Sequence, residues 1–381
     1  MMKLSILQNK LKEGVNIVKN ITSKSSTLPI LNNVLLRAKG NFLNLTTTDL
    51  EVGINWWILA KIEQEGEIVI PARIFSDFVG LLPDKTINLT VENNTLLINA
   101  KNYQTKIKGI DSENFPIIPK IKKAQQISIE SHPFCQGISQ IVDFTAPSTI
   151  RPEISGIYLS LQKDLLIMAS TDSFRLGEKR IFLKEPFESV QKCSLILPQR
   201  TARELINIFG ERECKIKIYF GANQIMFETG LEETQHPQIQ FVSKLIEGEY
   251  PQYSEIIPKK YKTQAILKRD EFLNHIKTAS LFSGRINEIK IKVDPSKNQV
   301  EIFCQNPELG ERKSFFYGKI EGQENEVSFN YKFLLDGLLN IKKPEVLFAL
   351  SEKKEGEEGP GVLKPVGDET YIYIAMPIQA S

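Results

Sequence analysis

The sequence predicts an α+β fold made of three repeats of about 125 residues, each with two helices and antiparallel sheets. One observation behind this prediction is self-similarity at a spacing of 123 residues, which relates Leu11 to Phe134 and Thr48-Asp49 to Thr171-Asp172. A second is that the apolar pattern of the first helix returns at 272–279. Because three such units fill all 381 residues, the repeats set the architecture before any local motif does.

The first half of repeat one reads as a strand, a helix and a pair of strands. Residues 4–7 are expected to form a short strand, and the apolar spacing of residues 9–20 predicts a helix. Strands at 30–36 and 42–45 flank the turn Lys39-Gly40-Asn41.

The second half of repeat one adds a helix and several strands. Pro71 stands near the start of a helix expected at 73–81, and Asn93-Asn94 is a pair that favours a hairpin turn. The remaining strands are expected at 52–59, 67–70, 87–91, 96–100 and 103–109. The corresponding domain boundaries are 1–120, 126–251 and 258–381.

Composition places few limits on function. Apolar residues make up 41% of the chain, which suffices for ordinary cores, and the net charge is only +2. A balanced chain can still bind nucleic acid if its basic residues gather on one surface. No run approaches the roughly 18 apolar residues of a membrane helix, and the start of the chain has no signal-peptide core. We therefore expect a cytoplasmic protein without a membrane partner.

The four cysteines predict free thiols. Cys135, Cys193, Cys214 and Cys304 lie in apolar stretches, and none belongs to a C-x-x-C pair. This pattern is typical of buried thiols in a reducing compartment.

Basic residues recur on or near equivalent helices. Singly, such residues usually cover a solvated helix face, but recurrence across repeats favours a nucleic-acid surface. The candidate DNA-binding residues are Lys12, Lys19, Lys24, Arg73, Arg151, Arg200 and Arg203.

Several segments resemble one family in their order and spacing. They are Thr27–Leu36 with Leu45–Glu51, Ile70–Arg73, Thr171-Asp172 with Arg175-Leu176, and Tyr373–Pro377. Together they resemble the bacterial DNA polymerase III β subunit, the sliding-clamp family, over essentially the whole chain. The resemblance implies three clamp domains that form half of a six-domain ring, with helices lining the hole and sheets on the outer rim.

The resemblance also implies a function and partners. The ring would encircle double-stranded DNA without sequence preference and would tether the DNA polymerase III catalytic subunit, which confers processivity. A clamp loader, other polymerases and repair proteins that carry clamp-binding peptides would be further partners. The alternative is a clamp-fold scaffold for repair or translesion partners without a main replicase role.

Two further sets of residues follow from the resemblance. A head-to-tail homodimer interface would involve Tyr103, Lys106, Leu281, Phe282, Glu308 and Glu311. An apolar partner-peptide pocket between domains two and three, with Thr171 and Arg175 as polar anchors at its rim, would consist of Ile154, Thr171, Phe174, Arg175, Leu176, Pro251, Ile256, Ile374, Met376, Pro377 and Ile378.

The chain departs from the family pattern at this pocket. Ser173-Phe174 replaces a common Gly-His, Glu255 stands where a basic residue can occur, and Gln379-Ala380-Ser381 lacks the usual arginine and final leucine. These differences bear on which peptides the pocket prefers.

Catalytic interpretations are weaker. Asp49 and Asp172 recur at equivalent places and suggest a metal-dependent hydrolase, but a role in a turn fits them better. The histidines His132, His236 and His275 show no ligand spacing. We therefore expect no catalytic residue, no metal and no cofactor.

Overall fold

The computed structural model describes residues 2–22, 28–119, 121, 125–147, 150–186, 193–231, 234, 236–352 and 358–379. The chain divides into two compact units. Unit 1 consists of Met1–Cys135 and Arg203–Leu245, and unit 2 consists of Gln136–Ala202 and Ile246–Ser381. Among the described residues, no helix is long and apolar enough to cross a membrane.

Repeat one contains the expected elements and one additional strand. Its elements are β1 (Met2–Leu7), α1 (Gln8–Ile21), β2 (Asn33–Lys39), β3 (Phe42–Thr48), β4 (Val52–Leu59), β5 (Lys61–Gln64), β6 (Gly66–Pro71), α2 (Ala72–Leu81), β7 (Thr86–Glu92), β8 (Thr95–Ala100) and β9 (Tyr103–Lys108). The start of the strand expected at 30–36 is instead a 3-10 turn, Pro29–Asn32. Proline at its first position has a fixed φ that suits a turn.

Repeats two and three follow the same order. Repeat two contains β10 (Gln125–Glu130), α3 (Ser131–Ile141), β11 (Gly156–Leu161), β12 (Leu165–Thr171), β13 (Arg175–Phe182), β14 (Cys193–Pro198), α4 (Gln199–Phe209), β15 (Lys215–Phe220), β16 (Gln224–Gly230) and β17 (Pro237–Lys244). Repeat three contains β18 (Thr263–Lys268), α5 (Arg269–Ser280), β19 (Glu288–Asp294), β20 (Gln299–Asn306), β21 (Gly310–Tyr317), β22 (Lys319–Gly322), β23 (Asn325–Asn330), α6 (Tyr331–Asn340), β24 (Glu345–Leu350), β25 (Gly361–Pro365) and β26 (Tyr371–Ala375).

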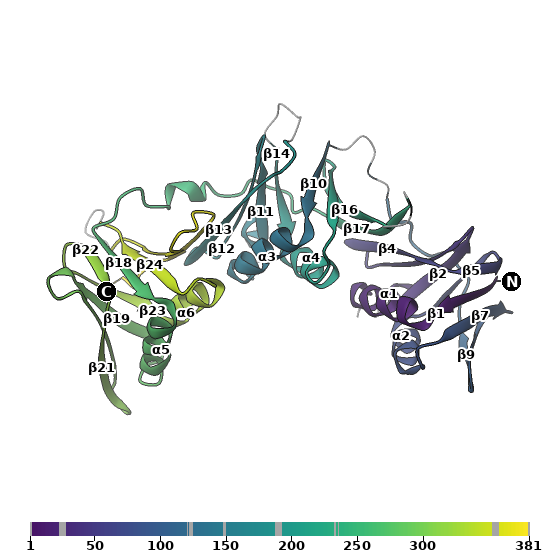
Figure 1. Ribbon diagram of the computed structural model, residues 1–381, viewed down its shortest axis with the longest axis horizontal. Coiled ribbons are helices and arrows are strands. Elements are labelled where there is room, and N and C mark those ends of the chain that lie inside the picture. The colour runs from purple at the N-terminus through teal and green to yellow at the C-terminus, as the bar shows by residue number, and fades with distance from the viewer. Residues whose placement is uncertain are drawn as a thin grey trace. The chain divides into compact units, whose positions relative to one another are not determined.

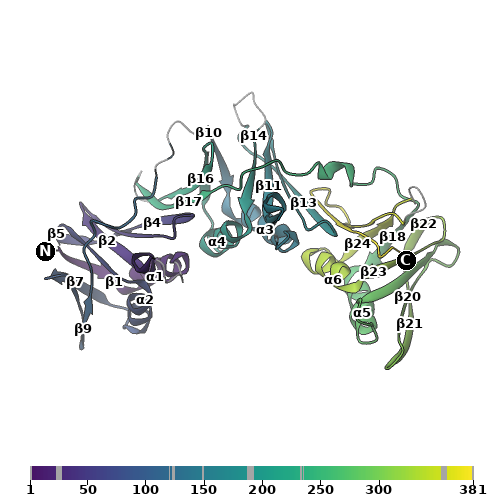
Figure 2. The same ribbon diagram turned by 180° about the vertical axis from the view of Figure 1, so that it is seen from behind.

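Paired helices pack on the sheets in the first and third repeats. In Figures 1 and 2, α1 lies beside α2, and α5 lies beside α6. Helix α1 buries Leu11, Val15 and Val18 because they recur on one helical face. Strand β7 alternates buried and exposed residues, so one face of its sheet meets the core.

The turns confirm the repeat at the level of single residues. Leu50 has φ 77° and Ser173 has φ 76°, a left-handed conformation that is unusual for non-glycine residues. In each turn the preceding aspartate accepts a hydrogen bond from the backbone N–H three residues on, at 2.8 Å for both Asp49 and Asp172. The prediction that these aspartates serve a turn is confirmed. Asn93 and Asn94 also adopt positive φ, as a tight hairpin requires.

Strand pairing joins consecutive repeats. In unit 1, β4 of repeat one pairs antiparallel with β17 of repeat two, within the order β10-β15-β16-β17-β4-β3-β2-β6. In unit 2, β13 of repeat two pairs antiparallel with β26 of repeat three, within the order β14-β11-β12-β13-β26-β25-β24-β18-β22. Two smaller sheets have the orders β5-β1-β7-β8-β9 and β21-β20-β19-β23. The fourth strand of one repeat therefore meets the last strand of the next repeat in both cases.

The cysteines are free, as predicted. Cys135 and Cys304 are buried, whereas Cys193 and Cys214 are half-buried. Burial raises the pKa of the Cys135 thiol to about 12, so it stays protonated at neutral pH.

Two helical glycines predict opposite stability effects. A Cβ on Gly337 in α6 would lie 2.4 Å from the Tyr373 ring, whereas a Cβ on Gly80 in α2 would meet nothing within 4 Å. We expect Gly337→Ala to destabilise the protein by about 1–3 kcal/mol, because the core has no room for it. Gly80→Ala should stabilise it by up to about 1 kcal/mol through helix propensity alone. Differential scanning calorimetry of both variants checks this, and an unchanged melting profile for Gly337→Ala would contradict the packing.

Candidate functional site

The floor of the expected peptide pocket is formed where β13 pairs with β26. Leu176 lies opposite Ile374 in this ladder, and both side chains are at most 2% exposed. They pack in one cluster with Tyr253, which comes from the connector that follows repeat two. Strand pairing therefore fixes two of the expected pocket residues side by side.

Three tyrosines support this floor. Tyr158 stacks on Tyr250 with ring centroids 5.1 Å apart, and Tyr253 meets Tyr158 edge-on at 5.9 Å. The Tyr253 hydroxyl donates a hydrogen bond to the buried Glu178 carboxylate at 2.7 Å. Burial first, and the Glu178 charge second, raise the pKa of Tyr253, so its hydroxyl remains a donor. The sequence analysis did not identify these tyrosines, because their contacts link segments far apart in the chain.

Thr171 and Arg175 are engaged within the protein in this structure. The Thr171 hydroxyl donates to the Arg175 carbonyl at 2.6 Å. The Arg175 guanidinium pairs with Asp172 at 2.9 Å and also with Asp336 of α6. Only 16% of the Arg175 side chain is exposed. These contacts fix the turn before β13 to α6, and the role of Thr171 and Arg175 as polar anchors for a peptide stays a prediction.

Aromatic rings surround Arg175. Its guanidinium carbon lies 5.5 Å from the Phe144 ring centroid and 5.0 Å from that of Phe333. Burial opposes the Arg175 charge, but Asp172 and the other acidic neighbours outweigh burial and raise the pKa of this side chain. A guanidinium over two ring faces is a stable arrangement for a half-buried cation.

The rim of the expected pocket is apolar and exposed. Phe174 is 60% exposed and stacks on Phe333 at 6.2 Å between centroids. The Met376 N–H donates to the Phe174 carbonyl at 2.9 Å, and Ile256 is 45% exposed. Ile256 and Met376 both line a cavity of about 840 Å³. Apolar side chains around one methionine suit a surface that accepts apolar peptide side chains.

The other expected pocket residues have different surroundings. Ile154 is 4% exposed and belongs to the core, whereas Pro251 is half-buried. Pro377 is buried, and the Ile378 N–H donates to the Ser328 carbonyl at 2.8 Å. This bond fixes the C-terminal segment against β23. Ala380 and Ser381 lie outside the described residues.

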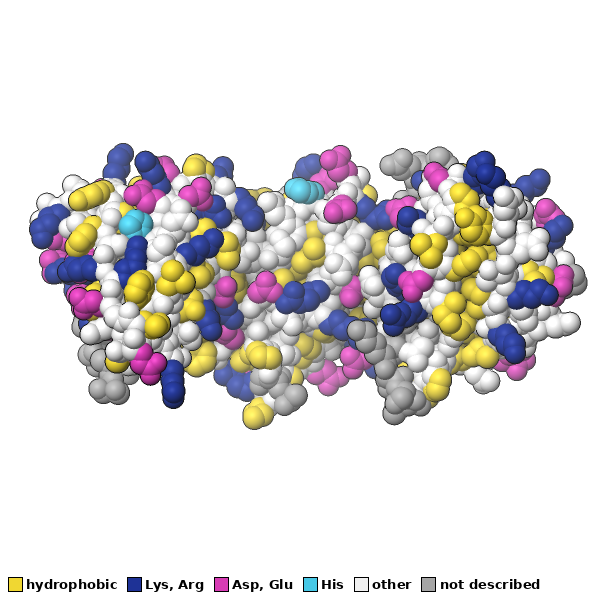
Figure 3. Space-filling view, turned by 90° about the horizontal axis from the view of Figure 1, so that it is seen from below, with side chains coloured by type: hydrophobic (Ala, Val, Ile, Leu, Met, Phe, Trp, Pro, Cys, Tyr) yellow, Lys and Arg dark blue, Asp and Glu magenta, His cyan; other side chains and the backbone are white. Residues whose placement is uncertain are grey.

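The candidate DNA-binding residues that are described lie on or beside helices. Lys12 is exposed on α1, and Lys19 of the same helix lies 3.4 Å from Asp77 of α2. Arg73 begins the same α2 surface, with 92% of its side chain exposed. In the space-filling view of Figure 3, Lys and Arg side chains are spread over the surface among acidic and apolar ones.

The remaining basic candidates are in repeat two. Arg200 and Arg203 are exposed in the first turns of α4, and Arg151 forms an ion pair with Glu153 at 3.1 Å. Lys24 lies outside the described residues.

The expected dimer residues lie at two sheet edges. Tyr103 and Lys106 belong to β9, the last strand of the five-stranded sheet. Glu311 belongs to β21, the last strand of the four-stranded sheet, and Glu308 precedes that strand. Leu281 is 70% exposed just after α5, beside the half-buried Phe282.

Sequence reasoning missed three apolar residues at this second edge. Leu309, Phe315 and Tyr317 are 62%, 45% and 65% exposed. Phe315 and Tyr317 are two residues apart on β21, so they share one face. The aromatic run Phe315-Phe316-Tyr317 is visible in the sequence, but sequence alone does not show that the strand ends a sheet.

Comparisons with known proteins agree with this architecture. Three domain profiles of the DNA polymerase III beta subunit match the chain: the N-terminal domain at residues 2–119, the central domain at 128–252 and the C-terminal domain at 254–379. The beta sliding clamp of Bacillus subtilis is 28% identical over 390 residues, which cover 99% of this chain and 100% of that protein. The beta sliding clamp of Staphylococcus aureus is 28% identical over 389 residues, covering 100% of both.

Solved structures lead to the same family. The crystal structure of the sliding clamp from Bacillus subtilis superposes with a TM-score of 0.91 at 27% identity and covers 100% of both chains. A sliding clamp from Pseudomonas aeruginosa bound to griselimycin has a TM-score of 0.91 at 25% identity, again over 100% of both chains. The three repeats, their strand-paired junctions and these full-length matches show that the chain belongs to the DNA polymerase III beta subunit family.

Proposed function

We propose that this protein is a sliding clamp that encircles duplex DNA as a head-to-tail homodimer and tethers the replicative polymerase. The observation that carries the proposal is the recurring junction. Strand β4 pairs with β17, and β13 pairs with β26. By the same rule, β21 of repeat three should pair with the last strand of a following repeat, and β9 is such a strand that ends its sheet.

A second copy of the chain supplies the missing partners. If β21 of one copy pairs with β9 of the other, two equivalent contacts close a ring of six repeats. Closure also covers sheet edges that would otherwise promote aggregation. The exposed apolar residues Leu281, Phe315 and Tyr103 lie at or near these edges, and Lys106 offers charge complementarity to Glu308 and Glu311.

The ring accounts for processivity without catalysis by this chain. A closed ring on a duplex dissociates only by opening, so a tethered polymerase experiences a high effective concentration of template. Contacts of Lys and Arg with phosphate are independent of sequence and therefore permit sliding. The chain would act in the cytoplasm with a clamp loader and with polymerases and repair proteins that carry clamp-binding peptides. These peptides would bind at the β13·β26 junction.

The first prediction concerns assembly. Light scattering at micromolar concentration should give about twice the chain mass of 43.3 kDa. Leu281→Asp should give monomers, because closure would bury an unpaired carboxylate. Ile150→Asp is the matched control, since Ile150 is 91% exposed in repeat two, which contains neither β9 nor β21. A stable wild-type monomer would contradict ring closure.

The second prediction concerns DNA. After loading on nicked circular DNA, the protein should elute together with the DNA in gel filtration. It should separate from the DNA once the DNA is linearised. Direct affinity should be weak and fall with salt, because it rests on phosphate contacts. Charge reversal at Arg73, Arg200 and Arg203 should reduce loading while the dimer mass stays the same. Lys217→Glu on strand β15 is the control for charge change, and equal retention on circular and linear DNA would argue against encirclement.

The third prediction concerns the peptide pocket. Deleting residues 376–381 should abolish binding of a replicase C-terminal peptide in calorimetric titration, since it removes Met376 and the bond that anchors Ile378. Phe174→His should change the binding free energy by about 1 kcal/mol, as expected for one side chain outside a hot spot. Phe182→His is the matched control, because Phe182 is a 68% exposed phenylalanine at the far end of β13. Unchanged affinity after the deletion would mean that the pocket lies elsewhere.

A further inference from the structure

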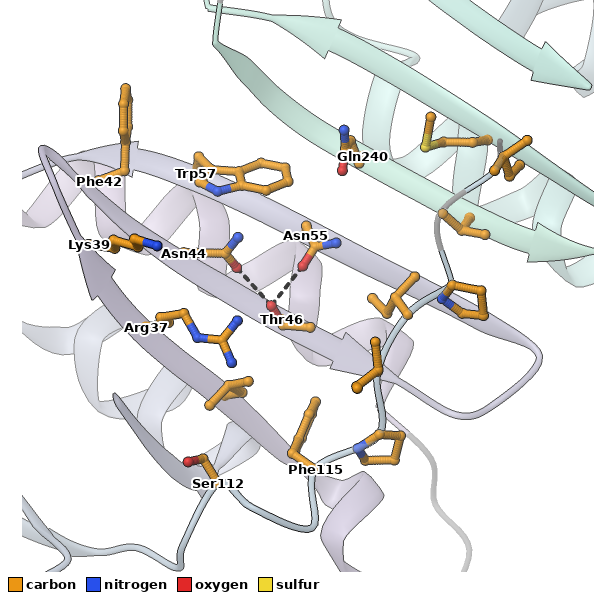
Figure 4. Close-up of a pocket in the computed structure, with 18 of the residues that line it drawn as sticks. Arg37, Lys39, Phe42, Asn44, Thr46, Asn55, Trp57, Ser112, Phe115 and Gln240 are labelled. Atoms are coloured by element: carbon orange, nitrogen blue, oxygen red, sulfur yellow. Dashed lines mark hydrogen bonds between the residues drawn. The ribbon is translucent and has the colours of Figure 1, made fainter. Parts of the chain in front are cut away.

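The β4·β17 junction of unit 1 carries a cavity of its own. Its volume is about 640 Å³, and it lies on the face of β2, β3 and β4 opposite the helices, with a wall from connector residues 112, 115–119 and 121 (Figure 4). Gln240 and Val242 of β17 complete its lining. None of the DNA-facing or pocket residues described above belongs to it.

The strand register places polar and aromatic groups in one row across the cavity floor. Arg37 lies opposite Asn44, and Asn44 lies opposite Trp57. The neighbouring row contains Thr46 and Asn55, and the Thr46 hydroxyl lies 2.7 Å from the side-chain oxygens of both Asn44 and Asn55. The hydroxyl has one proton and donates to one of these oxygens at a time, and the amide N–H₂ groups of Asn44 and Asn55 add donors beside the cavity.

Hydrogen bonds to Glu67 hold Arg37 in place at one edge of the cavity. Arg37 Nε donates to Glu67 at 2.6 Å, and Ser112 donates to the same carboxylate. The Ser112 hydrogen bond, followed by Arg37, lowers the pKa of Glu67. Lys39 lies two residues from Arg37 on the same face (Figure 4), and within the described part of the chain it forms no ion pair.

Aromatic and apolar groups form the rest of the lining. Phe42 stacks on His236 with centroids 4.1 Å apart, and Trp57 meets His236 edge-on at 5.4 Å. The connector contributes Phe115 and Ile117, of which Ile117 is 91% exposed. Residues 116–119 lie outside any helix or strand.

The lining of the cavity suits a ligand that has one carboxylate next to an apolar side chain. Among the described residues of the lining there is no acidic side chain, Glu67 already pairs with Arg37, and Lys39 forms no ion pair. A nucleic-acid strand gains affinity from several phosphate contacts at once, which this cavity does not offer. One carboxylate between Arg37, Lys39 and the Asn44 amide is a charge-assisted match, and an adjacent aromatic side chain can pack on Trp57.

The repeat indicates that the occupant is a peptide. Pro116 and Ile121 of this cavity correspond to Pro251 and Ile256 at the β13·β26 junction, each at a spacing of 135 residues. We propose that the β4·β17 cavity is a second peptide-docking site, which takes a partner segment with an acidic residue next to an aromatic one. The proposal rests on the proposed function in one respect, which is that partner peptides bind at such junctions.

The two tryptophans of the chain allow a direct test. Trp56 is 1% exposed in the core and Trp57 lines the cavity, so 5-fluorotryptophan labelling gives one resonance for the site and one internal control. The full-length protein is titrated with acetyl-Gly-Asp-Phe-Leu-amide and followed by fluorine NMR, with Trp57→Phe to assign the signals. The Trp57 resonance should shift with saturation, and the Trp56 resonance should not.

Probes and variants of similar shape but different charge test whether Lys39 contacts the peptide carboxylate. Replacing aspartate by asparagine in the probe should weaken binding about tenfold, because it removes the charge-assisted hydrogen bonds. Lys39→Gln should weaken binding of the aspartate peptide by a similar factor and leave the asparagine peptide unaffected. Lys85→Gln is the control, since this exposed lysine lies between α2 and β7 and does not line the cavity.

Three results would overturn the proposal. They are no shift of Trp57, an equal response to the two peptides, and a stronger response to octathymidylate than to the acidic peptide. Failure here leaves the proposed function standing if a replicase peptide still binds at the β13·β26 junction, because Trp57 reports only on the first junction.

Discussion

Antiparallel pairing between strands of consecutive repeats is the constraint on which the rest of the structure depends. At each junction, the fourth strand of one repeat and the last strand of the next share a hydrogen-bond ladder. A ladder fixes register, because a slip by one residue would turn every side chain to the other face of the sheet. Register at β13·β26 is what places Leu176 opposite Ile374. The floor of the proposed peptide pocket is therefore a consequence of how the repeats are joined.

Buried polar groups keep that floor rigid. Glu178 is 3% exposed, yet its two carboxylate oxygens accept from the Tyr253 hydroxyl and from Arg180. A buried carboxylate without such partners would be strongly destabilising. The contact also ties the connector after repeat two to β13. The Arg175 contacts with Asp172 and Asp336 join the turn before β13 to α6 in a similar way. Directional bonds thus hold the apolar surface of the proposed pocket, and a peptide bound there would meet a preformed shape.

Local sequence patterns predicted most helices and strands, but they could not predict which distant segments pair with each other. The apolar spacing of Leu11, Val15 and Val18 identified α1, and Asn93-Asn94 identified a hairpin that needs positive φ. Strand β5 was missed because Lys61–Gln64 is short and polar, so it shows no alternation of apolar residues. The resemblance supplied the pocket positions, but it did not indicate that Arg175 pairs with Asp336, 161 residues away. Such contacts depend on the sheet order, which periodicity does not encode.

The strand ladders at the β4·β17 and β13·β26 junctions are covered by apolar side chains in different ways. Gly53 and Leu176 occupy equivalent positions at the spacing of the repeat. A Cβ on Gly53 would lie 2.8 Å from Ile118, so the connector isoleucine rests directly on that strand. At the second junction the strand supplies the apolar side chain itself, and Leu176 packs with Tyr253 of the connector. Both arrangements cover the ladder with apolar atoms, as a buried junction requires. The first leaves Arg37, Lys39 and Trp57 around a cavity with both polar and apolar lining, and the second leaves an apolar rim at Phe174 and Ile256. The two equivalent junctions therefore present surfaces of different chemistry, one with cationic and aromatic groups and one with an apolar rim.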